Sequence, residues 1–214
     1  MPVTTPTTML EAVNHLLTAI GTTPVNTLEV PGLTDASIAK DTIEATAREV
    51  QTRGWWFNTM RNFTLSPSGG EIVVPPNFTS VRPALPTSTQ AGETRQFVVV
   101  SGKLYDTMTN SHTFTSQVRA EVIRLVDFDQ LPESVRWFIT VRAARIFQTK
   151  VMGDEQLGVF TSTHEIEAFE AIERDHRNST HSSIYADRIA LRHSQARMGP
   201  APMGPRRGGQ QQGQ

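Results

Sequence analysis

Apolar residues near the N-terminus recur every three or four positions, which predicts two helices. The first apolar face consists of Leu10, Val13, Leu16, Leu17 and Ile20. Thr8 and Glu11 stand at its start with the spacing of a capping box, and Gly21 ends it. The second face consists of Ala36, Ala39, Ile43, Ala47 and Val50. A connector that contains prolines and a glycine, residues 22–33, separates the two helices.

The second helix runs into the stretch around which the rest of the chain is organised, residues 44–58. Gly54 predicts a left-handed helix end, because glycine has no Cβ to clash there. Trp55, Trp56 and Phe57 follow directly, and large aromatic residues favour extended structure. We therefore expect Gly54, Trp55, Trp56 and Phe57 to form a structural hinge between a helical layer and a β region. Such an aromatic cluster belongs to a core more often than to a ligand site.

Short runs rich in β-branched and aromatic residues predict an antiparallel β region after residue 62. The expected strands are 63–65, 71–74, 96–100, 103–105 and 120–126. Turn-forming residues such as those at 67–70 and Pro75-Pro76 separate them. Ser101 and Gly102 bring two of these strands within hairpin range. Residues 83–93, rich in Pro, Thr and Ser, are typical of an exposed loop.

Helical spacing returns at Pro132 and Glu133, which suit a helix start, and continues to about Met152, with Gly153 as the stop. The apolar arc of this helix is wide, which predicts contacts on more than one side. A last helical region begins at Asp154 or at a Ser162/Glu165 capping box. In that region the residues expected to face inward are Ile166, Phe169 and Ile172, and those expected to face outward are Glu167, Glu170 and Glu173.

Together these elements predict an α+β fold, in which a helical bundle of about four helices holds an inserted antiparallel β domain. The expected boundaries are 1–60 and 128–182 for the two parts of the helical domain, 61–127 for the β domain, and 183–214 for a C-terminal arm and flexible tail. Residues after Gly199 are rich in Gly, Pro and Gln and cannot bury enough apolar surface to fold alone.

Composition narrows the class of protein. The chain has 214 residues, 37% hydrophobic and only 19% charged, so most of it should fold. A net charge of -1 gives no global basic field that would drive the whole chain onto nucleic acid or an anionic membrane. The absence of cysteine excludes disulfides and thiolate metal sites. The sequence shows no signal peptide and no apolar run of the roughly 20 residues that span a bilayer, so we expect a soluble, unsecreted protein.

Candidate chemistry in the ordered part is sparse. No phosphate-binding loop, dinucleotide fingerprint or HExxH motif is present, and His176 and His181 are too far apart on a helix to form a metal pair. Asp127, Asp129 and Glu133 are the best candidates for the paired carboxylates of a glycan hydrolase. They also lie where a strand passes into a helix, so capping is the favoured interpretation.

The C-terminal region carries a local basic bias. Ile184, Arg188, Ile189, Arg192 and Arg197 are the residues expected to form an amphipathic arm. This arm is either a solvated tail or a segment that docks on an acidic partner or on nucleic acid. No aromatic residues are interleaved with the arginines, so base stacking has no support.

Three blocks of the sequence are similar to a known family. They are EAVNHLLTAIGTTPVNTLE at 11–29, REVQTRGWWFN at 48–58 and VIRLVDFDQLPESVRWFITVRAARIFQ at 122–148. Their order and spacing resemble the tail tubular protein A family of short-tailed phages, also called gatekeepers or adaptors. The resemblance extends from about residue 9 to about residue 175, with a looser match in the β region.

The resemblance implies a virion tail protein that is assembled in the host cytoplasm as a ring of twelve copies. Such a ring joins the portal protein to the nozzle, tail tubular protein B, and encircles the channel through which DNA passes without sequence-specific binding. Tail fibres attach near this junction. The family implies no catalytic site, cofactor, metal or membrane, and we expect the C-terminal arm to dock on the portal. A glycan hydrolase and a DNA-binding module remain the competing hypotheses.

Overall fold

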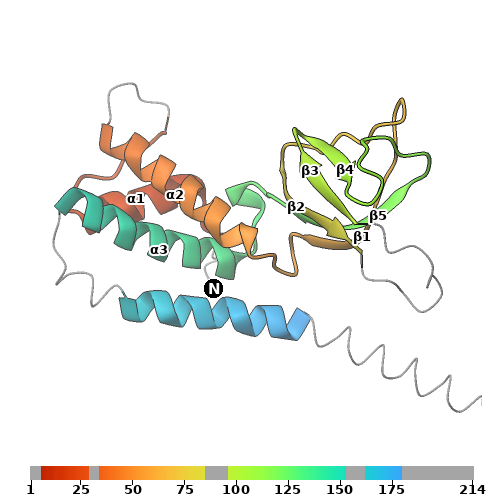
Figure 1. Cartoon of the computed structure of the whole chain (residues 1–214). Coiled ribbons are helices and arrows are strands. Elements are labelled where there is room, and N and C mark those ends of the chain that lie inside the picture. Colours follow the sequence, from red (N-terminus) through yellow and green to blue (C-terminus); the bar gives the residue numbers. More distant parts are fainter. Residues whose placement is uncertain (1–5, 29–33, 85–95, 153–161, 180–214) are drawn as a thin grey trace, which may run out of the picture. The chain divides into compact units, whose positions relative to one another are not determined.

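A computed structural model describes residues 6–28, 34–84, 96–152 and 162–179 of the chain. Figure 1 shows helices α1 (Met9–Ala19), α2 (Thr34–Thr52) and α3 (Glu133–Met152), each of which contacts the other two. A further helix covers 162–179 and is drawn in blue. The strands are β1 (Thr59–Leu65), β2 (Phe78–Pro83), β3 (Phe97–Val100), β4 (Lys103–Asp106) and β5 (Val118–Arg124). A 3-10 helix, η1 (Phe128–Gln130), connects β5 to α3. The fold class is therefore α+β, as predicted.

The two N-terminal helices form where the apolar periodicity predicts them. The Thr8 hydroxyl accepts from the Glu11 backbone N–H, and the Glu11 carboxylate accepts from the Thr8 N–H, so the predicted capping box is present. In α2 all five residues of the predicted stripe are buried, namely Ala36, Ala39, Ile43, Ala47 and Val50. These small residues allow α1 and α3 to approach α2 closely.

Helix α3 fills the centre of the helical core. Its buried side chains include Val135, Phe138, Ile139, Ala143, Ala144 and Phe147. Because α3 contacts both α1 and α2, its wide apolar arc has two partners. Trp137, which widens that arc in the sequence, is 44% exposed and lies edge-on to the ring of His15.

The helix 162–179 adds Ala168, Phe169 and Ile172 to the same core. The prediction that Ile166 faces inward is wrong, because its side chain is 60% exposed. Glu165 occupies the inward position instead and is paired with two arginines of α3. Ile166 lies about 100° further round the helix, outside the arc that reaches the core.

The strands form two small antiparallel sheets around a second core. One sheet has the order β1-β5-β2, and β3 pairs with β4 in the other. Four of the five predicted strands are present, although 71–74 forms only isolated bridges, including one between Val73 and Lys103. β2 was missed, because Pro75-Pro76 precedes it and Pro83 is its last residue, and these prolines suggest a loop. Apart from Pro83 and Ala84, the residues of the predicted loop 83–93 lie outside the described ranges.

The predicted hairpin joins β3 to β4. Ser101 and Gly102 both have positive φ, 51° and 75°, which is the geometry of a two-residue type I′ turn. The right-handed twist of such a turn matches the twist of the strands it connects. Leu104 and Phe97 are buried in the second core with Leu65, Ile72, Val118 and Val122.

Gly54 has the left-handed backbone conformation that the sequence predicts for the end of α2. Its φ is +79°, and a Cβ built on it would lie 2.8 Å from Ile123 Cδ1. The residue therefore meets two separate requirements, a left-handed backbone and close approach to β5. Gly21, which follows α1, has nearly the same φ of +78° but nothing within 4 Å of the added Cβ.

The substitution Gly54→Ala should destabilise the protein more than Gly21→Ala does. Both changes carry the strain of a left-handed non-glycine residue, about 1–3 kcal/mol. Gly54→Ala adds overpacking against Ile123, about 1–3 kcal/mol more. Urea unfolding of both variants measures the difference. Equal losses would show that the backbone conformation alone requires glycine at position 54.

Candidate functional site

The chain passes between its helical and β elements at residues 53–58 and 125–127, and a network of buried amides joins these two crossings. Gln51, in the last turn of α2, donates to the Val126 carbonyl at 3.0 Å and accepts from the Val126 N–H at 2.8 Å. Asn58 donates to the Gln51 carbonyl at 2.9 Å and accepts from the Trp55 N–H at 2.7 Å. Each side chain is 2% exposed, so these bonds fix the crossings in a site shielded from water.

Aromatic side chains surround the first crossing. Trp55 is 3% exposed, and its indole N–H donates to the Val50 carbonyl at 2.8 Å. Its ring contacts those of Phe169 and His176, while the Arg53 guanidinium lies 4.8 Å from its centroid. Trp56 and Phe57 are half-buried and pack against the same core. Gly54, Trp55, Trp56 and Phe57 thus lie together, and their role as a hinge stays a prediction.

A cluster of ion pairs joins the helix 162–179 to α3. The carboxylate of Glu165, whose side chain is 13% exposed, accepts from Arg142 at 2.7 Å and from Arg145 at 2.5 Å. Arg142 also donates to Glu49 of α2 at 2.7 Å. Burial alone would raise the pKa of Glu165, but its hydrogen bonds to Arg145 and Arg142 outweigh that effect and lower the pKa.

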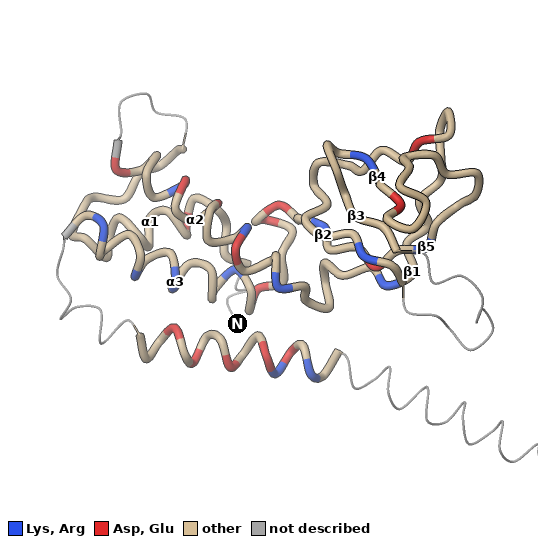
Figure 2. The backbone as a smooth tube through the Cα atoms, in the orientation of Figure 1, with Lys and Arg blue, Asp and Glu red and all other residues tan. Residues whose placement is uncertain are grey.

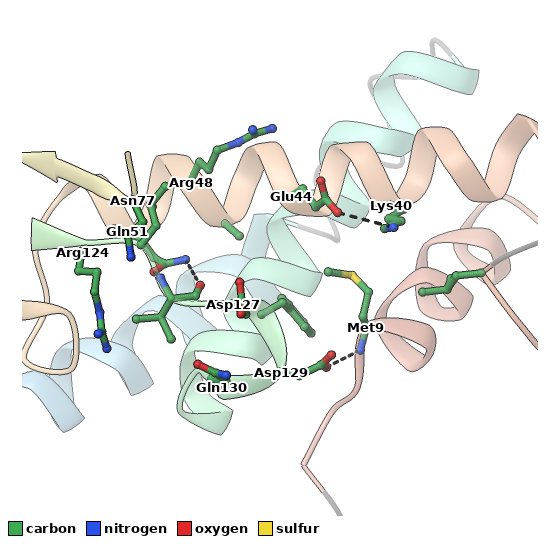
Figure 3. Close-up of a pocket in the computed structure, with 15 residues that line it drawn as sticks. Met9, Lys40, Glu44, Arg48, Gln51, Asn77, Arg124, Asp127, Asp129 and Gln130 are labelled. Atoms are coloured by element: carbon green, nitrogen blue, oxygen red, sulfur yellow. Dashed lines mark hydrogen bonds and ion pairs between the residues drawn. The ribbon is translucent and has the colours of Figure 1, made fainter. Parts of the chain in front are cut away.

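A groove of about 780 Å³ lies beside the second crossing (Figure 3). It is lined by α2, by residues 124–130 and by parts of the chain near Met9 and Leu28. Charged side chains of both signs line it, namely Lys40, Glu44, Arg48, Arg124, Asp127 and Asp129. Lys40 and Glu44 form an exposed ion pair at 3.9 Å. This mixed lining suits a protein surface better than it suits a uniformly charged ligand.

The predicted caps at the strand-to-helix junction have other partners. Asp127 is the N-cap of η1, but its side chain makes no capping bond. Asp129 accepts from the Met9 N–H at 3.0 Å. Glu133 accepts from the N–H and the hydroxyl of Thr7, at 2.8 and 2.6 Å. These carboxylates thus serve the fold, as the capping interpretation expects, but the helix start that Asp129 bonds is that of α1, and Glu133 holds the residue before its N-cap.

These contacts also weaken the glycan-hydrolase hypothesis. Asp127 and Asp129 line the same groove, whereas Glu133 does not. The Asp129 and Glu133 carboxylates are bonded to the N-terminal segment, whereas a catalytic acid and base must flank a substrate bond. Asp127 is exposed in the groove, and its side chain makes no capping hydrogen bond.

Several predicted features fall outside the described residues. They include the whole proposed arm, Ile184, Arg188, Ile189, Arg192 and Arg197, and also His181. His176 packs against Trp55 and Trp56. Among the residues that the structure describes, no group of three or more His, Asp or Glu side chains could hold a metal ion. Within those same ranges, no helix has the length and apolarity that crossing a membrane requires.

Sequence reasoning missed the Gln51 contact and the Glu165 cluster. Gln51 and Val126 are 75 residues apart, and Glu165 lies 23 and 20 residues from its two arginines. The signal available was weak. A glutamine in the last turn of α2 and two arginines three residues apart on α3 are ordinary features of exposed helix faces.

Comparison with known proteins gives two matches. A family model described as tail tubular protein matches residues 10–182. Tail tubular protein A of Klebsiella phage KP34 is 26% identical over 190 residues, which cover 88% of this chain and 97% of that protein. The family match includes all five strands and reaches from the second residue of α1 to beyond the last described helix. It therefore applies to the helical and the β elements together.

Glu165→Gln should destabilise the protein at pH 7 by about 1.5–3 kcal/mol, the range for hydrogen bonds to charged groups. Because the folded-state pKa of Glu165 is lowered, its contribution is complete above the ordinary value of 4.5 and is lost as pH falls through the folded-state pKa. The difference between wild type and variant should therefore shrink under acid conditions. Glu167→Gln, at an exposed position of the same helix, is the matched control.

Urea unfolding of the three proteins at neutral and acid pH gives this difference directly. A Glu165→Gln protein as stable as wild type at pH 7 would show that desolvation cancels the ion pairs. A difference that persists unchanged at acid pH would contradict the lowered pKa of Glu165.

Proposed function

We propose a specific place in the phage tail for this chain, which belongs to the tail tubular protein family and is thus a structural protein of a phage tail. In our proposal it is the gatekeeper or adaptor, which assembles as a ring of twelve copies between portal and nozzle. The ring encircles the channel through which DNA leaves the capsid, and it supports attachment of the tail fibres.

The observation that carries this proposal is the extent of the match. The KP34 relative bears the name tail tubular protein A, and the aligned span covers 97% of its length. An adaptor ring also requires two different surfaces on each subunit, because its interfaces are heterologous. The chain offers distinct surfaces of suitable kinds, including the mixed-charge groove beside α2 and the exposed Trp137 of α3.

We further propose that the segments 1–60 and 128–182 act as one helical domain and 61–127 as an inserted β domain. The two separate hydrophobic cores support this division. Residues 183–214 would form the arm. In this arrangement Gly54 to Phe57 form the hinge between the two domains. The hydrogen bonds of Gln51, Asn58 and Trp55 would fix the angle at that hinge.

A structural role needs no catalytic site, cofactor or metal, and we propose none. The partners would be further copies of the chain, the portal, the nozzle protein, a tail fibre and the DNA that passes through the channel. Assembly in the host cytoplasm is part of the same proposal. Acidic positions recur along the helix 162–179, with basic ones near its C-terminal end (Figure 2). This supports protein contacts, because the acidic groups would repel the phosphates of passing DNA.

The ring is tested by mass. Multi-angle light scattering of the purified protein with its portal should give a complex whose adaptor content is about twelve times the 23.7 kDa of one chain. A monomer in isolation is compatible with the proposal, since a lone subunit leaves both interfaces uncovered. A monomer that persists in the presence of the portal would contradict it.

The arm is tested by truncation after Asn178. We expect portal binding to weaken because the arginines of the arm, Arg188, Arg192 and Arg197, are suited to pair with carboxylates of the portal. The melting temperature of the free protein should change little. Binding is measured by sedimentation with purified portal at two salt concentrations. Unchanged portal binding, together with loss of a salt-sensitive DNA affinity, would show instead that the arm lines the channel.

A further inference from the structure

The sheet β1-β5-β2 has one face on the second core and one polar face. The core side of β5 carries Val118, Ala120 and Val122. Because successive side chains of a strand point to opposite faces, Arg119 and Glu121 lie on the other side. Arg119 is exposed and Glu121 is partly exposed, so this side of β5 is open to solvent.

The two strands beside β5 add arginines to the polar face. Arg82 of β2 lies opposite Glu121 in the register of the sheet. On β1 the register is irregular between Met60 and Phe63, whose side chains pack against the second core. Arg61 lies within that bulge and is exposed, so it points to the polar face. Three exposed arginines, one from each strand, thus form a basic face (Figure 2), namely Arg61, Arg82 and Arg119.

The basic face has an excess of positive charge. Glu121 is the only acidic residue in β1, β2 and β5, so three arginines stand against one glutamate on this face. None of the three arginines forms an ion pair with a described carboxylate. Two positive charges are therefore unbalanced on an exposed surface, where they attract an acidic partner.

The helix 162–179 carries the opposite charge on its outer side. Its inner side holds Ala168 and Ile172, which are buried in the helical core. Glu167 and Glu170 are exposed and form no ion pair with a described cation. Residues three apart are neighbours on a helix surface, so these two carboxylates repel each other. Together with Ile166, which is 60% exposed beside them, they form an acidic stripe.

We propose that the basic face of one copy of the chain docks on the acidic stripe of a second copy. This inference rests on the proposed function and deepens it, since it assigns surfaces to the contact between neighbours in the ring. The two carboxylates of the stripe match the two unbalanced positive charges of the basic face. Because the two surfaces differ, the contact is heterologous, as a ring requires.

The dimensions of a helix and a sheet suit this contact. The Cβ atoms of Glu167 and Glu170 are about 5–6 Å apart, as for any pair three residues apart on a helix. Neighbouring strands are about 4.8 Å apart, so arginines on adjacent strands lie within reach of the two carboxylates. The planar fork of arginine binds a carboxylate through two parallel hydrogen bonds. Docking would also cover Ile166, which removes its apolar surface from water.

DNA is a poorer occupant of the basic face. Glu121 lies among the three arginines, and its carboxylate would repel a phosphate. DNA would also leave the repulsion between Glu167 and Glu170 without a balancing cation. Contact with a second copy accounts for both surfaces at once, because each supplies the charge that the other lacks.

Charge reversal on each surface tests the contact. One variant combines Arg61→Glu with Arg119→Glu, and the other combines Glu167→Arg with Glu170→Arg. All four side chains are exposed, so the melting temperatures should stay close to that of wild type. Lys150→Glu reverses an exposed charge away from both surfaces and is the control. The readout is adaptor mass with portal by light scattering, at a series of protein concentrations.

Each reversed variant alone should need at least about a tenfold higher concentration than wild type to form the ring, because like charges then meet at every contact. An equal mixture of the two variants should restore the ring. In the mixture every reversed face can meet a reversed stripe, and every native face a native stripe. This alternation closes in a ring with an even number of copies. The control should assemble as wild type does.

Two results would overturn the inference. The first is normal ring formation by the Arg61→Glu/Arg119→Glu variant. If that variant also lost a salt-sensitive affinity for DNA, the basic face would be assigned to DNA. The second is a mixture that fails to assemble although each variant alone is defective. The two surfaces would then face different partners, such as the portal.

A further variant keeps the test decisive if the reversed sheet variant is unstable. Arg61→Thr with Arg119→Thr removes the charges and keeps residues that favour strands. It should assemble more weakly than wild type and with less dependence on salt, and equal assembly would contradict the inference. Wild type that forms no ring with portal would contradict the proposed function. Stronger association of the two reversed variants with each other than with themselves, measured by sedimentation, would still support the contact.

Discussion

The contact between the Gln51 side chain and the backbone of Val126 is the constraint on which the rest of the structure depends. A carboxamide carries a donor and an acceptor, so one side chain satisfies both the N–H and the C=O of Val126. Glutamate could accept but not donate, and leucine could do neither. With Gln51 almost fully buried, a residue that left Val126 unbonded would cost about 1–3 kcal/mol for each unsatisfied group. The contact thus fixes where the chain returns from its strands relative to the end of α2.

The helix 162–179 is held by a different kind of interaction. Only Ala168 and Ile172 of its side chains are fully buried, which is little apolar surface for a helix of this length. Its position is set instead by Glu165 with Arg142 and Arg145, and by Phe169 and His176 against Trp55. Directional contacts of this kind orient a helix more strictly than aliphatic packing does. Their net contribution to stability is smaller, because the ionic groups lose hydration.

The sequence predicts those parts of the fold that depend on local pattern. The stripe of α2, the Thr8/Glu11 capping box, the turn at Ser101-Gly102 and the helix end at Gly54 each follow from neighbouring residues. β2 and the orientation of Ile166 do not, because tertiary partners decide them. β2 is a strand because β5 is available to pair with it, despite the prolines before it and at its end. Glu165 faces inward in place of Ile166 because its carboxylate pairs with two arginines of α3. The candidate contact surfaces are the least predictable part, since periodicity in one chain describes only the packing of that chain.

The hairpin of β3 and β4 contains both residues that hold the second core and residues that do not. Phe97 anchors β3 in the core of the strands, and Leu104 on β4 is fully buried beneath the hairpin. The three valines that follow Phe97 add little to that core, because each is at least 42% exposed. A charge or a proline at an exposed strand position hinders pairing with another chain, as Arg82 and Pro83 of β2 illustrate. Packing in the second core therefore does not by itself account for three valines at these positions.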